Sequence, residues 1–217
     1  IMIIGTNFVY LHVPKTGGSS FEQMLIDRHE LSVMGDQHDT AGEIPEEHRD
    51  KFIFGFLRDP MKAEISNWRY HRFSWKSKEM TFEGWCEWRY GGNPAEYGYE
   101  LGLKDHEVEY GHIFNVRPAA GYFCDADGNC LANRICRYEN LTQEIERLSD
   151  ELGLDLNISD YNMMATATHD VPQPEVSPRA TELVYKAKAI DFSLHSMDGD
   201  ISTNYSCPAA PNYGYER

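Results

Sequence analysis

The sequence predicts an α/β protein with three layers, in which helices flank a central, mostly parallel β-sheet. Two observations lead to this fold class. Residues 7–13 and 52–57 are short and apolar on both faces, as strands buried inside a parallel sheet are. Each is followed by a segment with helical periodicity, at residues 19–30 and 61–72. This alternation is typical of βαβα units.

Later segments extend the pattern. Residues 120–123 and 133–138 are expected to add strands to the sheet. Thr81 and Ser177 are residue types that cap helix N-termini, so a helix is expected after each. A third helix, which Gly153 can end, is indicated by apolar residues at helical spacing: Leu141, Ile145, Leu148 and Leu152.

Length and charge limit the function classes. At 217 residues the chain can form one domain with a sizeable core. We expect that domain at 1–204 and an extended or disordered tail at 205–217. No apolar run is long enough for a transmembrane helix. The net charge of −15 argues against a nucleic-acid-binding surface. Residues 51–78 carry seven Lys or Arg against two acids, which favours a solvated helix face or a local anion-attracting field.

The five cysteines do not indicate a zinc site, because no Cys-x-x-Cys pair occurs. Cys124 and Cys130 bracket a turn sequence and would face each other across a hairpin. Cys86, Cys136 and Cys207 are scattered along the chain. We expect free thiols, with a Cys124–Cys130 disulfide as the alternative.

A loop suited to binding an anion connects the first strand to the first helix, and it runs Pro14-Lys15-Thr16-Gly17-Gly18-Ser19-Ser20. Glycines let backbone N–H groups approach an anion closely. The helix N-terminus adds unpaired donors and a positive dipole, and Lys15 adds a full charge. The ordinary alternative is a glycine-rich turn with a solvated lysine. In a Walker A loop the lysine follows the glycines, whereas here it precedes them.

A second candidate phosphate contact follows the next strand. Arg58 stands at the carboxyl end of residues 52–57, and Pro60 favours a helix start directly afterwards. Ser66 then lies about two turns into that helix. An arginine fork and a serine hydroxyl both donate to phosphate oxygens. The alternative is that Arg58 pairs with Asp59 or another carboxylate and that Ser66 is a surface residue.

These two motifs, in this order and about forty residues apart, resemble those of sulfotransferases that use 3′-phosphoadenylyl sulfate (PAPS). The resemblance covers roughly residues 6–195 and implies a P-loop NTPase-like sheet. It assigns the 3′-phosphate to Arg58 and Ser66. The chain departs from the family pattern at Ala63, where members commonly carry an arginine. The 5′-phosphosulfate is assigned to the loop residues Lys15, Thr16, Gly17, Gly18, Ser19 and Ser20.

The resemblance also implies an activity, which is sulfuryl transfer from PAPS to an acceptor hydroxyl, expected on a carbohydrate, with release of adenosine 3′,5′-bisphosphate (PAP). By analogy with phosphoryl transfer, positioning and charge stabilisation do most of the work. Lys15 would offset charge growing on the leaving phosphate, and no metal is required. Relatives that sulfate sugars carry a His or Glu base between the two motifs. This indicates His38, oriented by Asp39, and the alternative is a surface histidine in a polar loop.

Residues 73–112 form the expected acceptor-binding region. Most of their aromatic rings are expected in the core, and the others can stack on a sugar or phenol. Eight aromatic residues lie within 27 positions: Phe73, Trp75, Phe82, Trp85, Trp88, Tyr90, Tyr97 and Tyr99.

Two other functions are weighed against this one. The strand at 52–57 with Asp59 resembles a magnesium-binding strand of a kinase that uses ATP, although Pro60 and the missing Walker A loop weaken that interpretation. A non-catalytic binding protein that keeps a nucleotide fold is the third possibility. Many eukaryotic relatives are anchored in the Golgi membrane, and this sequence shows no anchor. A bacterial or viral cytoplasmic enzyme is therefore expected, with a trimmed Golgi-lumenal domain as the alternative.

Overall fold

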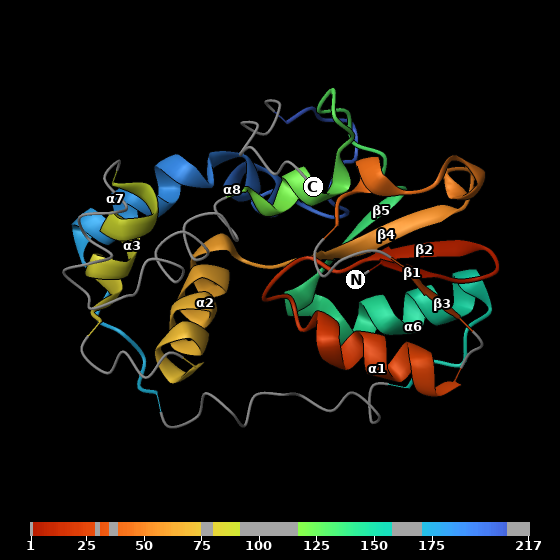
Figure 1. Cartoon of the computed structure of the whole chain (residues 1–217), viewed down its shortest axis with the longest axis horizontal. Helices are drawn as coiled ribbons and strands as arrows, with labels where there is room; N and C mark the ends of the chain where they lie inside the picture. The colour runs from red at the N-terminus through yellow and green to blue at the C-terminus, as the bar shows by residue number, and fades with distance from the viewer. Residues whose placement is uncertain are drawn as a thin grey trace.

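The computed structural model is an α/β protein built on an open sheet of five strands in the order β3-β1-β2-β4-β5 (Figure 1). It describes residues 2–28, 31–34, 39–74, 80–91, 117–157 and 171–207. No helix within those ranges is long and apolar enough to cross a membrane. The strands are β1 (Met2–Ile4), β2 (Phe8–Leu11), β3 (Ser32–Met34), β4 (Phe52–Leu57) and β5 (Arg134–Arg137).

The sheet is mixed rather than mostly parallel. β2 pairs in parallel with β4, and β4 pairs in parallel with β5. β1 is antiparallel to both β2 and β3. Only residues 5–7 separate β1 from β2, and so short a link can close a hairpin but cannot carry the crossover that parallel strands need. The first residues of the chain therefore form a strand of their own.

Six α-helices lie in the described parts of the chain, and those predicted from periodicity and caps are confirmed. Thr81 accepts from the N–H of Gly84, and Ser177 accepts from the N–H of Ala180, so both act as helix caps. Gly153 ends its helix with φ +67°. The helices are α1 (Gly18–Arg28), α2 (Pro60–Ser74), α3 (Phe82–Tyr90), α6 (Leu141–Leu152), α7 (Pro178–Ala187) and α8 (Ala189–His195).

The predicted strand at 120–123 is wrong, because these residues belong to a 3₁₀ helix, η3 (Ala119–Phe123). The N–H groups of Ala119 and Ala120 donate to the two carboxylate oxygens of Asp191, at 2.8 Å each. A side chain distant in sequence therefore takes the donors that a strand ladder would use. The strand predicted at 133–138 is confirmed as β5.

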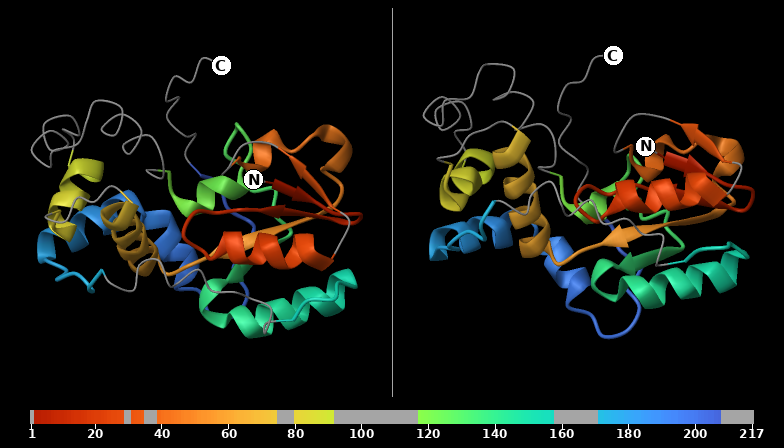
Figure 2. Two further views of the ribbon diagram at one scale, coloured as in Figure 1. Left: turned by 60° about the horizontal axis from the view of Figure 1, so that its bottom comes forward. Right: turned by 90° about the horizontal axis from the view of Figure 1, so that it is seen from below.

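Both faces of the sheet are covered. On β2, Phe8 and Tyr10 point to one face and Val9 and Leu11 to the other, as the two-residue period of a strand requires. α1 and α6 lie together against the first of these faces (Figure 2). The second face packs against η3, the short 3₁₀ helix η1 (Ala41–Glu43) and Leu194 of α8.

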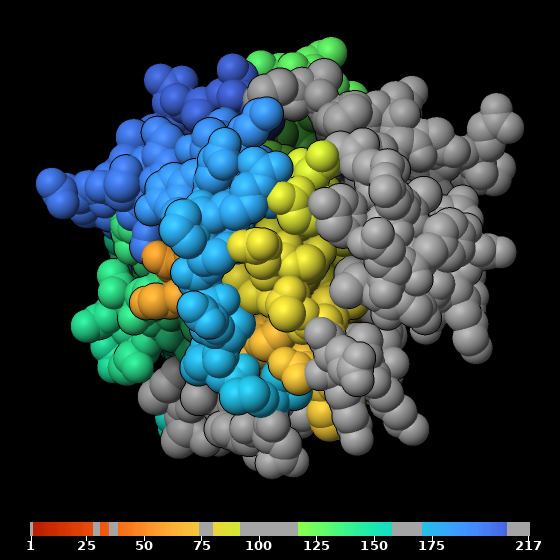
Figure 3. Space-filling model, turned by 90° about the vertical axis from the view of Figure 1, so that its left-hand side faces the viewer, coloured from red at the N-terminus to blue at the C-terminus, as the bar shows by residue number. Residues whose placement is uncertain are grey.

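A third cluster of buried residues joins α2, α3 and α7 beside the sheet. Figure 3 shows α7 lying directly along α3 on this side of the molecule. Trp85 and Trp88 of α3 are completely buried here, which confirms that most aromatic rings of this segment that can be described are in the core. The other parts of the predicted acceptor region, residues 75–79 and 92–112, lie outside the described residues.

The predicted tail is packed at its first three residues. The hydroxyl of Tyr205 donates to the carbonyl of Ala120 at 2.8 Å. Ser206 pairs with Asn129, and Cys207 is buried. Residues 208–217 lie outside the described ranges.

We expect Gly55→Ala to lower the free energy of unfolding by about 1–3 kcal/mol, measured by urea denaturation. Gly55 lies in the middle of β4, and a Cβ there would come within 2.7 Å of both the Leu11 carbonyl oxygen and the Phe123 ring. Gly121→Ala is the control, since its Cβ would meet only the flexible Arg117 side chain at 3.0 Å. Equal losses in the two variants would contradict the close packing of β4.

Candidate functional site

The loop after β2 has an unusual backbone at two positions. Gly17 has φ +74°, which glycine adopts freely, but Lys15 also has a positive φ of +65°. For a lysine this conformation costs on the order of 1–3 kcal/mol, so neighbouring contacts must maintain it. The hydroxyl of Thr16 donates to the Val13 carbonyl at 2.7 Å, and the N–H of Ser20 donates to the Gly17 carbonyl at 3.1 Å. These bonds close the turn and begin α1.

Gly18 has a different role from Gly17, because it allows close packing. A Cβ at this position would lie 2.1 Å from the ring of His12. His12 Nδ1 is 2.8 Å from a carboxylate oxygen of Glu22, and both side chains are buried. His12, the residue after β2, is thereby tied to α1.

Arg58 meets this loop from the neighbouring strand. β2 and β4 run in parallel with Leu11 opposite Gly55, and β4 ends two residues further on at Leu57, so both strands end at the same edge of the sheet. Arg58 Nη1 donates to the Lys15 carbonyl at 3.1 Å. The guanidinium carbon lies 4.7 Å from the centroid of the Tyr138 ring, which follows β5. The ends of all three parallel strands thus meet at one edge of the sheet.

No carboxylate within the described ranges pairs with Arg58, and its buried Nε has no hydrogen-bond partner there. Asp59 instead accepts from the N–H of Lys62 at 2.8 Å and caps α2. The alternative in which Arg58 pairs with Asp59 is therefore wrong. A buried, unpaired guanidinium N–H is a donor ready for an anionic ligand.

The Lys15 ammonium is the second such cation. Its Nζ lies 4.1 Å from the centroid of the Tyr70 ring, and it forms no ion pair with any side chain that the structure describes. Burial, and then the nearby charge of Arg58, lower its pKa to about 8. Lys15 is therefore still mostly protonated at pH 7, in surroundings that do not neutralise it.

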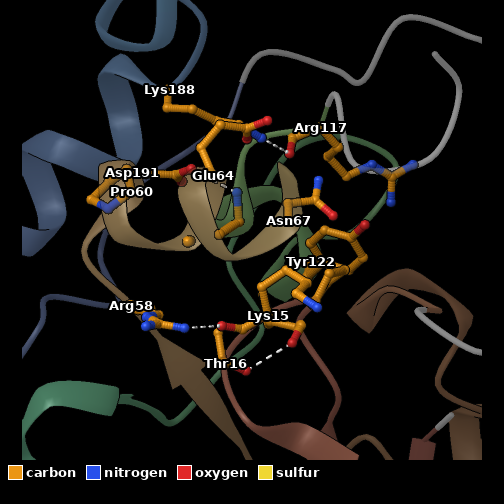
Figure 4. A pocket seen from close by; sticks show the side chains of 14 residues that line it. Lys15, Thr16, Arg58, Pro60, Glu64, Asn67, Arg117, Tyr122, Lys188 and Asp191 are labelled. Carbon is orange, nitrogen blue, oxygen red and sulfur yellow. Dashed lines mark hydrogen bonds between the residues drawn. The ribbon is translucent and has the colours of Figure 1, made fainter. Parts of the chain in front are cut away.

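A cavity opens between these groups (Figure 4). Its walls come from the loop after β2, the start of α2, the turn around η3 and the start of α8. The space, counted together with the open solvent at its mouth, is about 440 Å³. Four cationic residues line it: Lys15, Arg58, Arg117 and Lys188.

Glu64 is one of two carboxylates at the cavity, and both of its carboxylate oxygens contact side chains of α3. It accepts from the indole N–H of Trp85 at 2.6 Å and from the hydroxyl of Tyr90 at 2.7 Å. Its Oε1 is also 2.9 Å from Nε of Arg89, a completely buried arginine of α3. The negative charge of Glu64 is thus balanced by Arg89 rather than by the cavity cations.

The second carboxylate, Asp191, holds η3 in place through the N–H groups of Ala119 and Ala120. Lys188 completes this support, because its Nζ donates to the Arg117 carbonyl at 2.5 Å. The backbone of Arg117 is fixed, but within the described ranges its guanidinium has no ion-pair partner and lies 5.6 Å from the Tyr122 ring centroid. Arg117 is therefore a third cation available to a ligand.

The structure brings together only part of the site predicted from sequence. Lys15, Thr16 and Arg58 line the cavity. Ser66 does not line it; it is half-buried on α2, one turn before Tyr70. His38 lies outside the described residues. The remaining loop residues shape the turn and begin α1 without lining the cavity: Gly17, Gly18, Ser19 and Ser20.

Sequence reasoning missed the residues that reach the cavity from distant segments. Arg117, Lys188 and the aromatic partners of the cations belong to no motif, and no signal in the sequence marks them. His71 was also missed. Burial and the charges of Arg89 and Lys15 lower its pKa to about 3, so it is a neutral imidazole at pH 7.

Comparisons with protein-family models, with curated proteins and with solved structures found no match for this chain.

We expect Glu64→Ala to lower the free energy of unfolding by about 3–5 kcal/mol, because it leaves the Arg89 guanidinium buried without its counter-ion. Urea denaturation measures the loss, and Glu64→Gln, which keeps an acceptor oxygen, should lose less. Glu146→Ala is the matched control, since Glu146 is exposed on α6. A Glu64→Ala protein as stable as the control would contradict the role of this ion pair.

Proposed function

We propose that this protein is a sulfotransferase that moves a sulfuryl group from PAPS to an acceptor hydroxyl, and that the acceptor is a carbohydrate. One observation carries the proposal. The two motifs that resemble sulfotransferase phosphate sites meet at the carboxyl edge of adjoining parallel strands, where Arg58 contacts Lys15 directly. Ligands of open α/β sheets bind outside that edge.

The donor set suits a ligand with two anionic ends. The buried Arg58 Nε lacks a partner among the described residues, and the Lys15 ammonium lacks a carboxylate there. Lys15, Thr16 and the backbone of the loop would hold the phosphosulfate end, and Arg58 the 3′-phosphate. Ser66 is close to the same face of α2 as Tyr70, and its hydroxyl is the proposed further donor. When bound, PAPS supplies an activated sulfuryl group whose leaving group is a phosphate.

Lys15 has the central role in this proposal. Its proton stays on Nζ and offsets the charge that grows on the leaving phosphate oxygen. An anion beside it raises its pKa again, which keeps the ammonium charged when it is needed. The Tyr70 ring restricts where the ammonium can lie.

The acceptor hydroxyl needs a base, and His38 remains our proposal for it, with Asp39 as its orienting partner. His71 lies close enough to Lys15 for the lysine charge to act on it, but its pKa of about 3 makes it a weak proton acceptor. We assign Arg117 to the acceptor, because it lines the cavity and its side chain extends away from Lys15 and Arg58, on the side of Tyr122 (Figure 4). No observation favours the kinase, since the carboxylate of Asp59 caps α2.

We expect PAP to bind the wild-type protein without metal, and Arg58→Ala to weaken that binding by about 10–100-fold through the loss of charge-assisted hydrogen bonds. Calorimetric titration in EDTA measures both affinities. Lys62→Ala is the matched control, because it removes an exposed cation from α2 that does not line the cavity. Failure of PAP to bind, together with binding of ATP and Mg²⁺, would refute the sulfotransferase and support the kinase.

We expect PAP affinity to fall as the pH rises through the Lys15 pKa of about 8. If the bound anion keeps Lys15 protonated, the loss between pH 7 and pH 9 is about tenfold. Lys15→Arg should bind PAP equally at both pH values, since a guanidinium stays charged. The phosphates of PAP are already ionised across this range. A pH dependence that persists in Lys15→Arg would assign the titration to another group.

A further inference from the structure

Two buried polar atoms that have no hydrogen-bond partner among the described residues belong to side chains lining the same cavity. One is Nε of Arg58, a donor, and the other is Oδ1 of Asn67, an acceptor. Asn67 is only 3% exposed. Buried polar atoms in proteins nearly always have a partner, so this pair of atoms indicates what a ligand must supply. The ligand needs an anionic group for Arg58 and a hydrogen-bond donor for Asn67.

Asn67 lies on the face of α2 that borders the cavity. Four residues of α2 line the cavity at spacings of three and four positions: Pro60, Ala63, Glu64 and Asn67. Asn67 is about two turns, or about 10 Å, along the helix from Pro60, its first residue. Figure 4 shows the Asn67 side chain toward Arg117 and Tyr122, on the side of the cavity away from Arg58. The two partnerless atoms therefore face different parts of a bound ligand.

The missing donor for Asn67 does not come from the described chain or from the anionic groups of the nucleotide. No described side chain donates to its Oδ1. The hydroxyl of Thr16, which also lines the cavity, donates to the Val13 carbonyl instead. Ionised phosphate and sulfate oxygens only accept hydrogen bonds. The donor must therefore belong to an uncharged part of the ligand.

A hydroxyl is the group that suits this side chain best. The amide of an asparagine carries an acceptor oxygen and N–H donors side by side, and a hydroxyl can both donate and accept. Tyr122 lines the same part of the cavity, and burial raises its pKa to about 12, so its own hydroxyl is uncharged at neutral pH. This part of the cavity thus presents uncharged hydrogen-bonding groups, as a sugar requires.

We propose that Asn67 is a specificity-determining residue that binds a sugar hydroxyl of the ligand, with Oδ1 accepting the hydroxyl proton while Lys15 and Arg58 bind the anionic groups. This inference rests on the proposed function. Two participants in the reaction carry such a hydroxyl, namely the ribose of the nucleotide and the carbohydrate acceptor. A ligand without a hydroxyl at this place leaves the amide oxygen buried and unpaired, and the site discriminates against it.

The first arm of the test compares PAP with its 2′-deoxy analogue, since the two differ only in one ribose hydroxyl. Calorimetric titration in EDTA measures both affinities for the wild type and for Asn67→Ala. If Asn67 binds the ribose, the wild type binds PAP about tenfold more tightly than the analogue, and Asn67→Ala binds the two alike. The wild-type comparison tests this source even if the variant does not fold.

The second arm titrates methyl β-D-glucopyranoside into protein saturated with PAP, and saturation-transfer NMR follows the binding. If Asn67 binds the acceptor, PAP and its analogue have equal affinities, and Asn67→Ala weakens glucoside binding about tenfold. Asn67→Leu fills the space of the amide without its polar atoms, so it should weaken binding as Asn67→Ala does. A loss in Asn67→Ala that Asn67→Leu restores would assign the effect to packing and overturn the inference.

Gln143→Ala is the matched control, because it removes an exposed amide from α6 that does not line the cavity, and it should leave every affinity unchanged. If the wild type binds PAP but Asn67→Ala alters neither the preference for PAP over its analogue nor glucoside binding, the inference is overturned and the proposed function stands. Failure of PAP to bind the wild type would refute the proposed function and this inference with it.

Discussion

The candidate site depends on the parallel pairing of β2 with β4 and on its register. With Leu11 opposite Gly55, β4 ends only two residues beyond β2, and the loop carrying Lys15 meets Arg58 without any long excursion of the chain. The hydrogen bond from Arg58 to the Lys15 carbonyl then joins the two motifs. It also helps to hold a lysine in a backbone conformation that it would otherwise avoid. A shift in strand register would separate the two cations and remove the site.

The cavity concentrates positive charge in a protein that carries a net charge of −15. This is possible because its two carboxylates are directed elsewhere: Glu64 toward Arg89, and Asp191 toward the N–H groups of η3. Lys15, Arg58 and Arg117 have no ion-pair partner in the described parts of the chain. The depressed pKa of Lys15 follows from the same arrangement. An anionic ligand would therefore gain binding free energy from charges that the fold has already desolvated. A small, multiply charged ligand is favoured over a long polyanion, because the acidic surface would repel the latter.

Local patterns were enough to predict β2, β4 and β5 and, of the helices in the described ranges, all but α8, since apolar periodicity, Thr81 and Ser177 act within a few residues of each element. They failed where a distant residue decides the structure. The segment at 120–123 has the composition of a strand, yet Asp191 accepts from the N–H groups of Ala119 and Ala120 at its start, and the segment forms a 3₁₀ helix. Lys188 fixes the backbone of Arg117 at the cavity, and nothing in the separation of these two residues along the sequence predicts that contact.

η3 connects the candidate site to the C-terminal part of the described chain. Its N–H groups are held by Asp191, and the carbonyl of Ala120 accepts from Tyr205, so residues 71 to 85 positions later fix both sides of its first turn. Tyr122, near the end of η3, lines the cavity, and Cys124, which directly follows η3, pairs with Cys130. Because so short a helix has few hydrogen bonds of its own, its order must come from these outside contacts. The part of the cavity wall that contains Tyr122 and Arg117 therefore depends for its order on residues 205–207 and on α8. A change that loosens residues 205–207 would first disturb the side of the cavity that Tyr122 and Arg117 line, while the contact between Arg58 and Lys15, which lies at the edge of the sheet, would persist.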